Sequence, residues 1–129
     1  MGRPEFGSIL LGTTDPERLR AWYAAAFEPE TDVDGWLRFG PVGILVDRRD
    51  DVSAKNPEPG RVIVNLHVSD ARALAERLDR LAVTWLVEPE QRADGWFATI
   101  IDPDGNYVQI IELNDDYLAR RSDRDSREG

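Results

Sequence analysis

The same succession of segments occurs twice in this sequence, and this internal repeat constrains the fold more than any other feature. Residues 8–27, SILLGTTDPERLRAWYAAAF, contain a short apolar stretch, then Asp15 and Pro16, then apolar residues at helical spacing. Residues 63–81, IVNLHVSDARALAERLDRL, repeat this plan around Asp70. Aspartate is favoured just before a helix, and proline is tolerated in its first turn. Both segments therefore predict a strand followed directly by an amphipathic helix.

The segments that follow the two helices also correspond. Residues 35–47, GWLRFGPVGILVD, and residues 95–113, GWFATIIDPDGNYVQIIEL, each begin with Gly-Trp and contain two strand-like runs separated by a Gly- or Pro-containing turn. A further short strand is predicted in each copy, at Thr31–Val33 and Val83–Val87. Each copy thus predicts the order strand–helix–strand–strand–strand. The predicted fold class is α+β, with two βαβββ modules.

The chain of 129 residues suits one domain made of these two modules. Module one is predicted at residues 6–50 and module two at residues 61–113. The linker between them, residues 51–60, is rich in charge, proline and glycine. Residues 114–129 lack apolar periodicity and predict a charged, disordered tail with at most a helical turn around Tyr117.

Charge and composition restrict the partners of the protein. The 16 basic and 25 acidic side chains give a net charge of −9, which repels nucleic acid and attracts cationic ligands. There is no cysteine, so disulfides and thiolate metal sites are excluded. No apolar run is long enough to cross a bilayer, and no leader resembles a signal peptide. A cytoplasmic protein without a membrane partner is expected.

With its Asp15 and Asp70 corners and its Asp-Pro-Asp-Gly-Asn turn at 102–106, the chain resembles the vicinal oxygen chelate superfamily. That superfamily includes glyoxalase I, extradiol dioxygenases, fosfomycin-resistance enzymes and bleomycin-resistance proteins. The resemblance covers Phe6 to Leu113. It implies that each module forms an open half-barrel and that paired modules enclose a cavity. It also implies a homodimer, in which the paired modules can come from different chains.

The resemblance also locates four positions at which the metalloenzymes of the superfamily carry metal ligands. Counted from the two corners and the turn, these positions fall at Ser8, Leu45, Ile63 and Gln109. Divalent ions select several carboxylates, imidazoles or amides, and one hydroxyl with one amide does not supply them. The sequence therefore predicts a cavity without metal or other cofactor, with Gln109 pointing into it.

Several further side chains are predicted to line this cavity. Asn65 and His67 alternate with Ile63 on one strand face, and Phe97 shares a face with Thr99. His67 is the only histidine; it is interpreted as a ligand-binding hydrogen-bond donor, as a general base, or as a structural residue paired with a nearby carboxylate or carbonyl. No catalytic residue or metal ligand is assigned. The predicted ligand-binding residues are Ser8, Phe39, Leu45, Ile63, Asn65, His67, Phe97, Thr99, Tyr107 and Gln109.

Aromatic side chains around a few polar groups are typical of a site for a small organic molecule. The sequence therefore predicts metal-independent binding of an aromatic or cationic small molecule, such as sequestration of an antibiotic, in the cavity between the modules. Two alternatives remain open. One is an enzyme of the superfamily that uses a metal or His67, and the other is a non-catalytic accessory or regulatory dimer.

Overall fold

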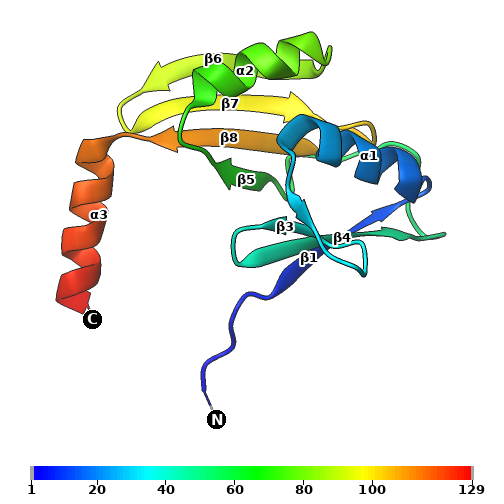
Figure 1. Ribbon diagram of the computed structural model, residues 1–129, viewed down its shortest axis with the longest axis horizontal. Coiled ribbons are helices and arrows are strands. Elements are labelled where there is room, and N and C mark those ends of the chain that lie inside the picture. Colours follow the sequence, from blue (N-terminus) through cyan, green and yellow to red (C-terminus); the bar gives the residue numbers. More distant parts are fainter. Residues whose placement is uncertain (1, 129) are drawn as a thin grey trace. The chain divides into compact units, whose positions relative to one another are not determined.

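The computed structural model describes residues 2–128, and the surroundings of their side chains as far as residue 123. The elements are β1 (Ser8–Thr13), α1 (Pro16–Phe27), β2 (Glu30–Thr31), β3 (Leu37–Phe39), β4 (Val42–Arg48), β5 (Val64–His67), α2 (Ala71–Arg80), β6 (Thr84–Arg92), β7 (Gly95–Ile101), β8 (Tyr107–Leu113) and α3 (Asp115–Glu128) (Figure 1). The order βαβββ occurs twice, as predicted. Within residues 2–128, no helix has both the length and the apolar composition needed to cross a membrane.

The chain forms two compact units. The first contains the chain up to Glu58 together with Asp102–Asn106, and the second contains Pro59–Ile101 together with the chain from Tyr107 onward. Each unit holds one mixed four-stranded sheet, with the order β1-β4-β3-β2 in the first and β5-β8-β7-β6 in the second. In both sheets the first strand of the repeat runs parallel to the last, and the remaining pairs are antiparallel.

In the first unit, α1 begins where the sequence predicts. The Asp15 carboxylate accepts a hydrogen bond from the Arg18 amide at 3.3 Å, which satisfies one donor of the helix N-terminus. The face of α1 that carries Leu19 and Tyr23 is completely buried. The sheet residues of this core are Leu37, Ile44 and Val46.

A buried hydrogen-bond cluster fixes the turn 102–106 in the first unit. The Tyr23 hydroxyl donates to Asp102 at 2.7 Å, and the amides of Asp104 and Asn106 each donate to Asp102 at 2.9 Å. The Asn106 side chain donates a further bond to Asp102 at 2.9 Å. Burial, reinforced by the negative charge of Asp102, raises the pKa of the Tyr23 phenol well above its usual value. The aspartate of this turn is therefore a structural hydrogen-bond acceptor.

In the second unit, α2 covers one face of the sheet (Figure 1). Asp70 caps the helix by accepting from the Ala73 amide at 3.1 Å, and Glu112 of β8 accepts from the Ala71 amide at 2.8 Å. The Arg72 guanidinium lies 4.8 Å from the centre of the Trp96 ring. Strand residues of the same face are buried, namely Ala98, Ile100, Val108 and Ile110.

The two Gly-Trp pairs of the repeat differ in their surroundings. Gly95 has φ +147°, and a Cβ atom placed on it would lie 1.9 Å from the carbonyl oxygen of Glu112. Gly35 has φ +86°, and a Cβ atom there would have no heavy atom within 4 Å. Only glycine adopts the first of these conformations readily, so Gly95 is required by both backbone and packing.

The C-terminal segment differs from the prediction of a disordered tail. Residues Asp115–Glu128 form α3, which extends from the end of β8 (Figure 1). The Asn114 side chain accepts from the Tyr117 amide at 2.8 Å, and Asp116 follows in the first turn, where negative charge is favourable. Arg120 also pairs with Asp94 at 3.2 Å. Capping and charge, rather than apolar periodicity, therefore account for this helix.

Candidate functional site

The face of the second sheet that lies opposite α2 carries a row of polar side chains. Gln109 of β8 is the cross-strand partner of Thr99 on β7 and of Asn65 on β5. Cross-strand partners project to the same face of a sheet, so one hydroxyl and two amides lie in one line across three neighbouring strands. Thr99 is buried, Gln109 is half-buried and Asn65 is exposed. Each of these three groups can both donate and accept a hydrogen bond.

Aromatic and aliphatic side chains flank the polar row on both sides. In one direction Ile111 is paired with Phe97 and with His67, and in the other Tyr107 is paired with Ile101. Six of the residues predicted to line the cavity lie on β5, β7 and β8 and share one face, namely Asn65, His67, Phe97, Thr99, Tyr107 and Gln109. Their role in ligand binding stays a prediction.

Two predicted residues lie at the margins of this face. Ile63 precedes β5 and is 41% exposed. His67 is the last residue of β5 and is exposed, and its side chain makes no hydrogen bond within the part of the chain that the structure describes. The pairing with a carboxylate or carbonyl that one interpretation of His67 required is therefore not seen among these residues.

Sequence reasoning missed a charged pair beside Phe97. The Arg92 guanidinium lies 4.8 Å from the centre of the Phe97 ring, and its Nε donates to Glu90 at 2.7 Å. Glu90 is in turn the cross-strand partner of Phe97. One side of the ring is thus occupied by a cation whose charge is balanced by a neighbouring carboxylate. The alternation of Glu90 and Arg92 before the Gly-Trp hairpin was the available signal.

In the first unit, Phe39 lies on the opposite face of its sheet from Ser8 and Leu45, whereas all three were predicted to line one cavity. Phe39 is paired with Val42 and lies 6.2 Å, centre to centre, from the ring of Phe27 on α1. It therefore packs on the helix side of its sheet, whereas Leu45 alternates with Ile44 and projects to the other side. Phe39 is half-buried and packs against the helix.

The opposite face of the first sheet carries Ser8 and Leu45. Ser8 is paired with Gly43, and Leu45 is paired with Leu10. A Cβ atom on Gly43 would lie 3.0 Å from the side chain of Trp36, which covers this glycine. The Arg38 guanidinium also lies over Gly43, with one nitrogen 3.0 Å from the same position, so this face carries a hydroxyl and a guanidinium beside apolar side chains.

The side chains at the four family metal positions do not fit a divalent ion. Ser8 and Gln109 offer one hydroxyl and one amide, and Leu45 and Ile63 offer no donor atom. In the second sheet, the partners of Gln109 are a threonine and an asparagine rather than carboxylates or imidazoles. Among the residues described by the structure, no group of three or more His, Cys, Asp or Glu side chains converges as a metal site.

The repeated βαβββ unit, with one helix on a mixed four-stranded sheet, defines the class of vicinal oxygen chelate proteins. Residues 8–111 match the family described as the glyoxalase-like domain, and the chain belongs to this family. No curated protein matches the sequence significantly.

Solved structures of the same fold belong to proteins with different activities. The trypanothione-dependent glyoxalase I of Leishmania major is 17% identical, with a TM-score of 0.71 over 98% of this chain and 97% of that chain. TnmS3, an antibiotic-binding protein from Streptomyces sp. CB03234, is 20% identical, with a TM-score of 0.66 over 88% and 99%. TioX from Micromonospora sp. ML1 is 16% identical, with a TM-score of 0.65 over 86% and 100%. At these identities the similarity shows the fold alone.

Proposed function

We propose that this protein binds an organic small molecule without a metal ion, on the sheet face opposite α2. The observation that carries this proposal is the polar row of Asn65, Gln109 and Thr99, bordered by Phe97 and Tyr107. Such a surface combines aromatic contact with a few directed hydrogen bonds, which is how proteins bind amphipathic organic ligands. An aromatic or cationic metabolite, including an antibiotic to be sequestered, fits this chemistry and the net charge of −9.

The similarity to TnmS3 supports binding as a use of this fold without catalysis, because TnmS3 is an antibiotic-binding protein. The similarity to a glyoxalase I supports the enzyme alternative only through the fold. The side chains at the family metal positions favour binding, since Leu45 and Ile63 have no donor atoms. Two alternatives do not depend on the metal positions, namely an enzyme that works through His67 and a non-catalytic accessory dimer.

The first test combines metal analysis with ligand screening. Purified protein should hold well under about one equivalent of zinc, nickel, manganese, iron or magnesium, and chelator should leave its melting temperature unchanged. In a thermal-shift screen of aromatic antibiotics and cationic metabolites, performed with chelator present, at least one compound should raise the melting temperature. Phe97→Ala should then weaken its binding by about 1–3 kcal/mol, because the aromatic contact with the ligand is lost.

Two controls make this test specific. Phe97→Leu retains apolar volume and separates loss of the aromatic contact from loss of packing. Phe6→Ala removes a phenyl ring that is 72% exposed and lies outside the strands, so it should leave affinity unchanged. A stoichiometric metal that disappears in Gln109→Ala would contradict the proposal and favour the enzyme alternative.

We also propose that the protein is a cytoplasmic homodimer without a nucleic-acid partner. Strands β1 and β5 are edge strands in their sheets, and unpaired edges favour association. Leu10 on β1 is also 49% exposed. Sedimentation velocity at micromolar concentration should give a single species of dimer mass. A monomer that persists at all concentrations would contradict the proposed assembly while leaving the ligand site in place.

A further inference from the structure

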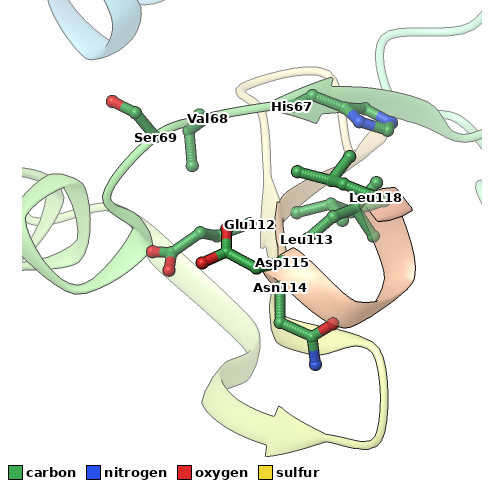
Figure 2. A pocket seen from close by; sticks show the side chains of 9 residues that line it. His67, Val68, Ser69, Glu112, Leu113, Asn114, Asp115 and Leu118 are labelled. Atoms are coloured by element: carbon green, nitrogen blue, oxygen red, sulfur yellow. The ribbon is translucent and has the colours of Figure 1, made fainter. Parts of the chain in front are cut away.

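A pocket of about 490 Å³ lies in the second unit, at the carboxyl ends of β5 and β8 and beside the start of α3. Its volume falls within the range of pockets that bind small ligands. Figure 2 shows its lining residues, which are His67, Val68, Ser69, Ile111, Glu112, Leu113, Asn114, Asp115 and Leu118. Apart from His67, none of them belongs to the predicted ligand-binding residues.

The lining has an apolar part and a polar part. Leu113 and Leu118 lie beneath the imidazole of His67, whereas the carboxylates of Glu112 and Asp115 project toward the side of Ser69 (Figure 2). A ligand in this pocket would therefore contact hydrocarbon at one end and negative charge at the other. This division predicts a molecule with a short apolar body and a charged head.

Some polar side chains of the pocket already make hydrogen bonds within the protein, and others do not. Glu112 uses one oxygen to accept from the Ala71 amide at 2.8 Å, and the Asn114 side chain donates to the Ala93 carbonyl at 2.8 Å. Asp115, in contrast, makes no ion pair with any residue that the structure describes. No lysine or arginine is among the lining residues. The carboxylates of the pocket thus lack a cation supplied by the lining itself.

From this charge and shape we infer that the pocket is a second binding site, for a small organic cation. A protonated primary amine with a short hydrocarbon chain places its ammonium group between the carboxylates of Asp115 and Glu112. Its hydrocarbon chain then covers Leu113 and Leu118. An anionic ligand of the same size is rejected, because it meets two negative charges. The pocket adjoins the polar row and shares His67 with the proposed site, but the charge argument uses Asp115 and Glu112, which lie outside that site, so this inference does not depend on the proposed function.

Titration of ¹⁵N-labelled protein with n-hexylammonium tests the inference. The probe should shift the amide resonances of residues 67–69 and 111–118, with a dissociation constant on the order of 1 mM. Hexanoate, which has the same hydrocarbon chain and the opposite charge, should leave these resonances in place.

Neighbouring aspartates of α3 provide a matched pair of variants. Asp115 and Asp116 both lie in the first turn of the helix, and only Asp115 lines the pocket. Asp115→Asn should weaken binding of n-hexylammonium about fivefold to tenfold, and Asp116→Asn should leave it within about twofold. Equal losses of affinity in both variants would mean that the probe is attracted only by the overall negative charge of the protein, and this result would overturn the inference. Equal binding of hexanoate, or shifts confined to other regions, would overturn it as well.

Discussion

Replacing Asp102 by alanine is expected to lower the free energy of unfolding by about 3–5 kcal/mol, because it leaves several buried donors without an acceptor. Asp102 is 3% exposed and accepts from the Tyr23 hydroxyl and from the amides of Asp104 and Asn106. The bonds from Tyr23 and Asp104 are buried, and the bond from Asn106 is partly buried. Urea denaturation of the wild type and the variant measures the loss directly.

Two further variants and a pH series separate this effect from a general change in charge. Tyr23→Phe should cost about 1–2 kcal/mol, and Asp50→Ala, at an exposed position, should stay within about 0.5 kcal/mol. Burial raises the pKa of Tyr23, so above about pH 10 the folded state retains a proton that the unfolded state releases. Wild-type stability should therefore fall more steeply with rising pH than that of Tyr23→Phe. Similar losses for Asp102→Ala and Asp50→Ala would contradict the assigned role.

Gly95→Ala is expected to destabilise the protein by about 4 kcal/mol or more, because the backbone and the packing both require glycine. The added Cβ atom would lie 1.9 Å from the Glu112 carbonyl oxygen, so β7 and β8 would have to separate. Gly35→Ala is the matched variant, since Gly35 also precedes a tryptophan and has a positive φ. It should cost only about 1–2 kcal/mol, as expected for a left-handed conformation without a clash. Thermal unfolding compares the two, and equal losses would contradict this account.

The order of the elements could be predicted from the sequence because the signals that set it are local. Asp15 and Asp70 form the helix caps that their positions predict. The extent of β6 could not be predicted in the same way. That strand was expected to end at Val87, yet it continues to Arg92. Irregular pairing between Trp85 and Val87, and between Val87 and Glu90, interrupts the alternation on which the prediction depended.

For the candidate site, the sequence predicted which residues share a face within one strand, but it did not predict which face of the sheet this is. Period-two alternation placed His67 with Asn65 on one face of β5 and Phe97 with Thr99 on one face of β7. Phe39 lies on the helix side of its sheet, whereas Phe97 lies on the side away from the helix, because the two Gly-Trp hairpins are not in the same register relative to their helices. Trp96 lies on the helix side of its sheet, whereas Trp36 lies on the side away from the helix. A shift of one residue reverses every side chain of a strand, and only tertiary pairing reveals it.

The first unit is discontinuous along the chain, because Asp102–Asn106 belongs to it although β5, α2, β6 and β7 are made earlier. A ribosome delivers the N-terminal residues first, so Tyr23 leaves the exit tunnel long before its acceptor Asp102 exists. The first unit therefore cannot acquire its full set of contacts until most of the second has been translated. A fragment that contains only the first repeat would lack Asp102–Asn106, so it would not contain the complete first unit. In this protein the boundaries of the sequence repeat and of the compact units do not coincide.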